Sequence, residues 1–339
     1  MKRTPYCLAF IGLSVGLVGQ GKATYFQTID PPGSSVATAS GINNAGQIVG
    51  QYGYVSFRDI GYLLSGGSYT PIDPPSAIGT SGASGINDAG LIVGFFSGGG
   101  TNHGFLLSGS GYTTLDVPGS AYTSASRINN AGQIVGIYSD GVRIRGFLLS
   151  GGSYTTLHVP GSIVTQAAGI NSSGQIVGNY SDAAGQFRGF LLNGSSYTTI
   201  DVPGSIQTGA SQINDAGQIV GSYYGAGGQH GFLLSGGSYS TLDVPGADET
   251  WATGINNDGV IVGAYFIDGV NHAFVGTPEP SSLTLFGLGT LGLSSYRWWR
   301  RIKARRIWRH RLSALSFPIG SSGRRKNVLV LRPIRRPSV

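Results

Sequence analysis

The stretch GINNAGQIVG, Gly41 to Gly50, occurs six times along the chain with small changes. The other copies begin at residues 85, 127, 169, 212 and 254, so the spacing is 42 to 44 residues. A second phrase alternates with it and reads GFLLSGGSYTTLHVPG at residues 146–161. Repeats of this length are typical of propellers and solenoids.

Each repeat contains four short apolar or alternating segments, which predicts four strands. The runs GFLL and YTTLDV are joined by SGGS, and the runs ending in GIN and beginning with QIVG are joined by NNAG. Both connections are short and rich in Gly, Ser and Asn, as in β-hairpins. Four strands a repeat is the composition of a propeller blade.

The turn in the opening stretch has a clear local chemistry. Its Asn can accept a hydrogen bond from the backbone two residues on, and its Gly can adopt the positive φ that such a turn requires. The predicted left-handed glycines are Gly46, Gly90, Gly132, Gly174, Gly217 and Gly259.

The two ends of the repeat region favour a closed ring over an open solenoid. The region begins at Tyr25 with the segment YFQTID, which corresponds to YTTLDV, and ends near Val275 with NHAFV, which corresponds to the GFLL strand that should precede it. A six-bladed β-propeller whose closing blade combines strands from both ends would bury both exposed edges. The predicted fold is therefore all-β, with a propeller over residues 24–276.

Charge is segregated along the chain. Residues 24–276 contain fourteen Asp and Glu and five Arg, a net of 5 − 14 = −9, whereas the segment from Arg297 onward contains fourteen Lys and Arg and no acid. A nucleic-acid partner is therefore not expected for the repeat region. Residues 1–23 have a basic start, an apolar run and small residues before Ala23, which predicts a signal peptide; it contains the one cysteine, Cys7.

The alternating phrases resemble the HAF family of bacterial extracellular repeats, named after the triplet found here as His272, Ala273 and Phe274. The resemblance covers Tyr25 to Val275. It implies an exported repeat protein and supplies no catalytic residue.

Two repeated polar positions are candidate binding sites. An acidic residue precedes VP or PP in five repeats and could form a ring of carboxylates near a channel mouth, although a role in fixing its own turn is favoured. These residues are Asp30, Asp73, Asp116, Asp201 and Asp243, with His158 in the remaining repeat. His103, His230 and His272 share a second position, with Arg145, Arg188 and Ile60 elsewhere, and packing is favoured over ligand binding. No catalytic motif, metal site or cofactor is predicted.

The repeats give way to TPEPSSLTLFGLGTLGLSSYRWWRR, which begins at Thr277. Residues 281–299 would span about 28 Å as a helix, close to the thickness of a bilayer core. Arginines follow, so the positive-inside rule places the propeller outside the cytoplasm.

This segment resembles the PEP-CTERM sorting signal, which an exosortase recognises in Gram-negative bacteria. The matching residues are Pro278, Glu279, Pro280, Arg297, Arg300 and Arg301. The resemblance implies a membrane-anchored precursor, processing by exosortase and a cell-surface or extracellular product, often alongside exopolysaccharide. The predicted sorting signal with its transmembrane helix spans residues 277–306, and residues 307–339 form a basic tail predicted to be disordered.

The sequence thus predicts an exported, non-enzymatic surface or matrix module with a structural or adhesive role. A carbohydrate-binding propeller is an alternative, in which tyrosines after IVG could stack on sugars, although they could equally be packing residues of the blades. A glycan-cleaving enzyme is a third. The tyrosines are Tyr52, Tyr138, Tyr180, Tyr223 and Tyr265.

Overall fold

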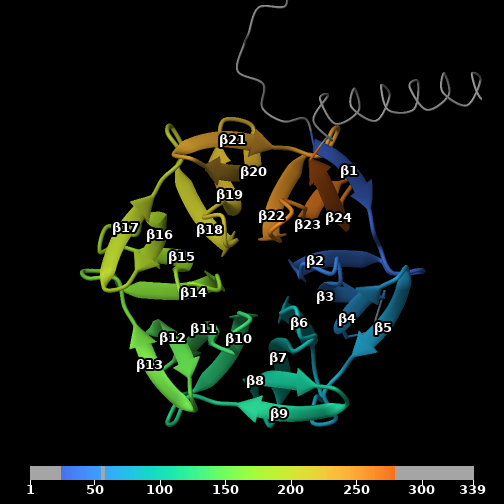
Figure 1. Cartoon of the computed structure of the whole chain (residues 1–339), viewed down its shortest axis with the longest axis vertical. Coiled ribbons are helices and arrows are strands. Elements are labelled where there is room, and N and C mark those ends of the chain that lie inside the picture. Colours follow the sequence, from blue (N-terminus) through green and yellow to red (C-terminus); the bar gives the residue numbers. More distant parts are fainter. Residues whose placement is uncertain (1–23, 55–57, 279–339) are drawn as a thin grey trace, which may run out of the picture. The chain divides into compact units, whose positions relative to one another are not determined.

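The computed structural model describes residues 24–54 and 58–278. All regular secondary structure in these residues is β-strand, and the 24 strands form six four-stranded antiparallel sheets. The sheets are arranged as blades around a central axis (Figure 1), with β2, β6, β10, β14, β18 and β22 innermost. The predicted six-bladed β-propeller is confirmed.

Blades 1 to 5 each consist of four consecutive strands. Blade 1 is β2 (Val36–Ile42), β3 (Ile48–Gly53), β4 (Ile60–Ser65) and β5 (Ser68–Ile72). Blade 2 is β6 (Ser81–Ile86), β7 (Ile92–Gly98), β8 (Thr101–Ser108) and β9 (Gly111–Leu115). Blade 3 is β10 (Tyr122–Ile128), β11 (Ile134–Ser139), β12 (Ile144–Ser150) and β13 (Ser153–Leu157). Blade 4 is β14 (Val164–Ile170), β15 (Ile176–Ser181), β16 (Phe187–Asn193) and β17 (Ser196–Ile200). Blade 5 is β18 (Gln207–Ile213), β19 (Ile219–Gly225), β20 (Gly228–Ser235) and β21 (Ser238–Leu242).

Blade 6 joins both ends of the described chain. It consists of β22 (Glu249–Ile255), β23 (Ile261–Ile267), β24 (Val270–Pro278) and, at its outer edge, β1 (Thr24–Thr28). The pairing of β1 with β24 is antiparallel and runs from Thr24 opposite Pro278 to Thr28 opposite Phe274. The predicted closure is therefore correct, and the last strand extends two residues beyond the predicted boundary at residue 276.

The core repeats from blade to blade because each sheet packs its apolar residues against the next. The third strand of each blade supplies a fully buried ring, which is Phe in blades 2 to 6 and Tyr62 in blade 1. In blades 1 to 5 a Tyr of the outer strand packs edge-to-face on this ring, as Tyr154 does on Phe147 at 5.5 Å between ring centroids. Edge-to-face pairs of this kind add to the energy of burial itself.

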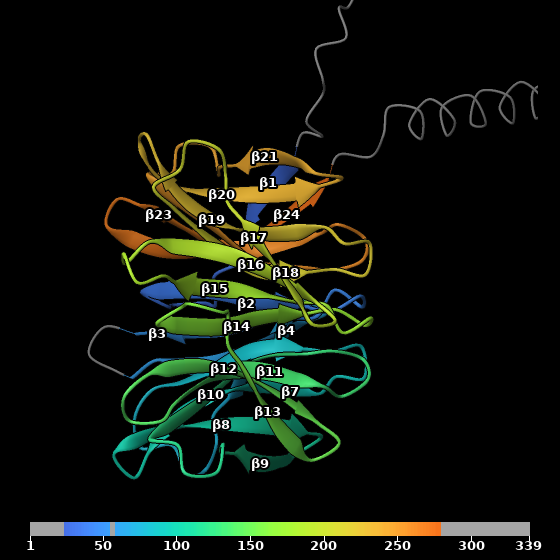
Figure 2. The ribbon, with the colours of Figure 1, turned by 90° about the vertical axis from the view of Figure 1, so that its left-hand side faces the viewer.

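The antiparallel blades give the ring two distinct ends, and the strands run between them (Figure 2). We call one end the turn face, because it carries the turns between the first and second strands and between the third and fourth strands of each blade. We call the other end the loop face; it carries the connections between second and third strands and the crossovers to the next blade. The chain enters β1 and leaves β24 at the turn face, where Pro278 lies beside the turn at Gly259.

Three predictions concern residues outside the described ranges. These are the signal peptide at residues 1–23, the transmembrane helix and the basic tail at residues 307–339. Within residues 24–54 and 58–278, the structure contains no helix with the length and apolar character needed to cross a membrane.

Candidate functional site

A closed ring of hydrogen bonds connects all six blades at the turn face. The Asn of each INxxG sequence is buried and opens the turn. Its side-chain amide donates to the backbone carbonyl of the equivalent Asn in the next blade at 3.0 to 3.3 Å. The last bond, from Asn256 to Asn43, crosses the seam between blade 6 and blade 1. The members are Asn43, Asn87, Asn129, Asn171, Asn214 and Asn256. We call this set the asparagine ring.

The same asparagines hold their own turns. The Oδ1 atom of Asn129 accepts hydrogen bonds from the backbone amides of Ala131 at 3.1 Å and Gln133 at 2.9 Å. The bond to the residue two positions on is the one expected from the sequence. The six turn glycines named above have φ between 74° and 79°, in the left-handed region. Each ring asparagine therefore satisfies backbone groups in its own blade and in the next.

A second, exposed row of polar side chains lies next to the asparagine ring. It contains two carboxylates, Asp88 in blade 2 and Asp215 in blade 5, which are three blades apart in a ring of six. Burial raises the pKa of Asp88, but hydrogen bonds from the Asn44 amide and from the side chains of Asn130 and Asn44 outweigh it and leave the pKa below its usual value. Ser172 and Asn257 lower the pKa of Asp215 in the same way. Both carboxylates are thus anionic and already hydrogen-bonded.

The asparagine ring surrounds a small cavity on the axis. Its volume is about 60 Å³, and it is lined by the two polar rows and by the isoleucines that precede them. This space can hold a few water molecules, whereas a pocket for a drug-sized ligand measures several hundred Å³. The axial cavity is therefore too small for such a ligand.

The loop face carries one charged pair in most blades. In blades 2, 4, 5 and 6 the Asp that follows the outermost strand bonds the His or Arg of the third strand in its own blade. The pairs are His103 with Asp116, Arg188 with Asp201, His230 with Asp243, and His272 with Asp30. In blade 1, where Ile60 occupies the His position, Arg58 reaches Asp73 instead. The two repeated positions weighed separately in the sequence thus meet in space.

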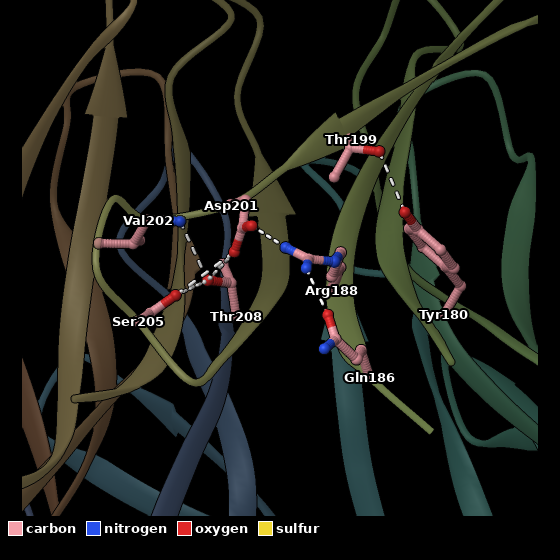
Figure 3. A network of polar contacts seen from close by, with 8 residues as sticks. All are labelled: Tyr180, Gln186, Arg188, Thr199, Asp201, Val202, Ser205 and Thr208. Atoms are coloured by element: carbon pink, nitrogen blue, oxygen red, sulfur yellow. Dashed lines mark hydrogen bonds and ion pairs between the residues drawn. The ribbon is translucent and has the colours of Figure 1, made fainter. Parts of the chain in front are cut away.

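The blade 4 pair shows how the Asp is held (Figure 3). Asp201 accepts hydrogen bonds from Ser205 Oγ at 3.3 Å and Thr208 Oγ1 at 3.2 Å, and it also bonds the Arg188 guanidinium. Thr208 Oγ1 in turn accepts from the Val202 amide at 3.0 Å. The carboxylate therefore fixes the crossover to the next blade, which agrees with the turn-fixing interpretation. Because these residues follow the outermost strands, they do not surround the mouth of the channel.

Blade 3 departs from this arrangement because His158 occupies the Asp position. Arg145 there turns to Asp140 in the neighbouring loop, with 3.2 Å between Nε and Oδ2. Burial, together with the positive charges of Arg145 and Arg143, lowers the pKa of His158. In blade 5, by contrast, Asp243 and the Ala226 carbonyl overcome the effect of burial and raise the pKa of His230.

The tyrosines considered for sugar stacking are parts of the blades. Tyr52 is buried, with 8% of its surface exposed, and the other four are half-buried. Their hydroxyls bond a Thr of the outermost strand in the same blade at 2.8 to 3.0 Å, as Tyr138 does with Thr156. Tyr265 also stacks on His272, with 5.1 Å between ring centroids. These contacts agree with the second possibility, that the tyrosines pack within the blades.

A depression with polar and apolar walls lies on the loop face. It has a volume of about 220 Å³ and lies between the crossover from blade 1 to blade 2 and the β7–β8 connection. Ile78, which is 80% exposed, lines it together with Ser97, Thr101 and Asn102. Among the described residues, no cluster of three or more His, Cys, Asp or Glu side chains is arranged to hold a metal ion.

Several solved structures of other proteins are similar to this chain at low sequence identity. Streptogramin B lyase is 13% identical, with 75% of this chain and 97% of that chain covered and a TM-score of 0.45. A mutant of Aleuria aurantia lectin bound to Fucalpha1-6GlcNAc is 14% identical, with 75% and 99% covered and a TM-score of 0.47. TolB from Acinetobacter baumannii is 15% identical, with 61% and 54% covered and a TM-score of 0.49. Such distant similarities carry no argument about binding or catalysis. No curated protein matches the chain.

One protein-family model matches a segment that begins at the end of the propeller. The PEP-CTERM protein-sorting motif matches residues 277–301. Of the predicted motif residues, Pro278 is the last residue of β24, and Glu279, Pro280, Arg297, Arg300 and Arg301 lie outside the described residues. The chain thus carries a PEP-CTERM sorting motif directly after its six-bladed propeller, which indicates an exported, cell-surface or extracellular protein that an exosortase sorts.

Proposed function

We propose that this chain is a non-enzymatic module of the cell surface or extracellular matrix with a structural or adhesive role, linked to exopolysaccharide. The observation that carries the proposal is the junction between propeller and motif. The sorting motif begins at residue 277, and β24 continues to Pro278 in pairing with β1. The propeller is therefore joined to the motif without a linker and is the cargo of the sorting step. The resemblance to exported HAF repeats supports the same role.

The junction lies at one face of the propeller. Because β24 runs from the loop face to the turn face, the chain enters the sorting motif at the turn face. The turn face is the part whose polar groups are bonded within the ring, whereas the loop face carries the charged pairs and the connections that vary in length.

Intact-mass measurement of the surface-associated protein in the native host tests the sorting step. We expect a dominant form that lacks all fourteen basic residues of the C-terminal segment, so the residues from 24 onward change from net basic to net acidic. We also expect it to retain Thr277 and Pro278, because both are paired in the closing blade. Glu279→Ala is the matched variant, since it alters the motif beyond the last paired residue. A dominant form that still contains Trp308 and Val339 would contradict the proposal.

Carbohydrate binding is the second candidate, and the depression beside Ile78 favours it. An exposed apolar side chain lies there beside hydroxyl and amide groups, a combination of apolar and hydrogen-bonding groups found in small-molecule sites. A glycan array should show binding by the wild type that Asn102→Ala weakens. Asn271→Ala is the control, because Asn271 precedes His272 in blade 6 as Asn102 precedes His103 in blade 2. Equal losses in both variants would argue against a site at this depression.

A further inference from the structure

Every innermost strand contains a β-bulge that leaves one residue out of the ladder. The register shifts at the same point of β2, β6, β10, β14, β18 and β22. A bulged residue leaves its backbone groups without their partners in the ladder. The bulged residues are Ser40, Ser84, Ser126, Ala168, Ser211 and Thr253. At least four of their carbonyls are free for another donor on the axis.

The guanidinium group of Arg127 occupies this position. Its Nη1 atom donates to the carbonyls of Ser84 at 2.5 Å and Ser126 at 2.8 Å. Its Nη2 atom donates to those of Ser40 at 2.6 Å and Thr253 at 2.5 Å. These four acceptors belong to blades 2, 3, 1 and 6, so one side chain from blade 3 connects four of the six blades. A planar group with several fixed donors suits such a circle of acceptors.

Arg127 is a buried cation whose charge is stabilised by backbone carbonyl groups. The side chain is buried, with the residue 8% exposed, and it forms no ion pair with any carboxylate in the described part of the chain. Burial lowers the pKa of Arg127 to about 10, which leaves it protonated at neutral pH. Carbonyl dipoles must therefore stabilise the charge, because an isolated buried charge is costly.

The equivalent position in the other blades leaves the axis to the Arg127 side chain. The position of Arg127 is Gly in four other blades and Gln212 in blade 5. A Cβ atom added at Gly85 would lie 2.9 Å from the Cα atom of Arg127 and 3.2 Å from its Cδ atom. At Gly254 an added Cβ would lie 3.3 Å from the Cα atom of Gly41. The glycines therefore keep the axis open for the arginine.

We propose that the bulge carbonyls form an axial binding site for a guanidinium cation and that Arg127 is its resident ligand. The site also closes the ring, since Nη2 bridges Ser40 of blade 1 and Thr253 of blade 6 across the seam. Thr253 Oγ1 donates to the Ala39 carbonyl at 2.6 Å across the same seam. Replacing Arg127 with Gly, the residue of the majority of blades, leaves the site vacant for a free cation of the same chemistry. This inference does not depend on the proposed function.

Chemical rescue tests the proposal on the full chain. Arg127→Gly should melt several degrees below the wild type, and low millimolar guanidinium chloride should restore part of that loss before its denaturing effect begins. Sodium chloride and urea at the same concentrations are the controls for ionic strength and denaturation. Gln212→Gly is the matched variant, because it removes the other long side chain at this position. For the wild type and Gln212→Gly, guanidinium should only lower the melting temperature.

Two outcomes would overturn the proposal. One is a melting temperature of Arg127→Gly equal to that of the wild type; the other is the absence of any rise with guanidinium. If Arg127→Gly does not fold, Arg127→Lys and Arg127→Met still decide the matter. The lysine variant keeps the charge and should melt above the methionine variant, which has a similar length and no charge; the opposite order would contradict a cation site.

Discussion

The two ends of the propeller follow the repeat to different degrees. At the turn face, the connections between first and second strands have five residues in all six blades. At the loop face, the connections between second and third strands have two to six residues. The asparagine ring is complete, whereas the charged pairs of the loop face change from His to Arg and change partner in blade 3.

This difference shows where the blades depend on each other. An asparagine of the ring bonds the backbone of the next blade, so its geometry must be the same at all six positions. A loop-face pair joins two side chains of one blade, as in Arg188 with Asp201, although Asp201 also accepts a hydrogen bond from Thr208 of the next blade. The residues of the pair differ from blade to blade, and the Arg changes its partner in blade 3. The variable end is accordingly the end on which binding functions can differ between blades.

The largest expected effect comes from breaking the asparagine ring. Asn129→Ala removes the donor to the Asn171 carbonyl and the acceptor of two amides in its own turn, which should cost about 3 kcal/mol of unfolding free energy. Urea unfolding measures this loss. Asn130→Ala, in the exposed second row, is the control and should cost at most about 1 kcal/mol. Equal losses would mean that the ring does not couple the blades.

A smaller effect is expected from the turn glycines. Gly132 has φ +77° and no atom within 4 Å of an added Cβ, so a substitution there acts through the backbone alone. Gly132→Val should cost about 1 to 2 kcal/mol, because a β-branched residue is strained in the left-handed region. Ala131→Ser should change the stability by less than about 0.5 kcal/mol. A Gly132→Val protein as stable as the wild type in thermal melts would contradict this account.

The smallest effect is the opposite pH dependence of two loop-face histidines. The raised pKa of His230 contributes stability that is present below the unfolded value of 6.5 and is lost as the pH rises through the folded pKa. The lowered pKa of His158 gives a penalty that appears as the pH falls from 6.5 through its folded pKa. His230→Gln should therefore cost more stability at a pH below these ranges than at a pH above them. His158→Gln should cost less stability at the lower pH than at the higher one. Urea unfolding midpoints of each variant and the wild type, measured at one pH on each side, test this. A change with pH that has the same sign for both variants would refute it.

The sequence was sufficient to predict the fold because its signals are local and repeated. The turn chemistry of Asn43 and Gly46 and the four short segments of each repeat predict the blade, and the position of YFQTID at the start predicts the closing strand. The boundary was less predictable: β24 continues to Pro278 because Thr24 and Tyr25 extend the ladder, and this pairing joins residues more than 250 positions apart.

The sites were harder to predict, because the two repeated polar positions pair only in the folded blade and the other contacts run between blades. The His103 and Asp116 positions, thirteen residues apart, keep the same spacing in blades 4 and 5, and this signal could have shown that they pair. The asparagine amides gave no such signal, since nothing in a local turn indicates the neighbouring blade. Arg127 was visible as a change from Gly, but the bulge carbonyls that bind it exist only in the folded ring.

The closing strand has a mechanical consequence for a protein attached to a surface. β24 is an interior strand, paired with β1 on one side and β23 on the other. Tension that enters through Pro278 and is resisted at the loop face acts along β24, so many hydrogen bonds on both sides must shear together. The same tension through Thr24 would act on an edge strand, which has a single neighbour, so fewer hydrogen bonds would resist it. A pull along the strands therefore meets more resistance at the end of β24 than at the start of β1.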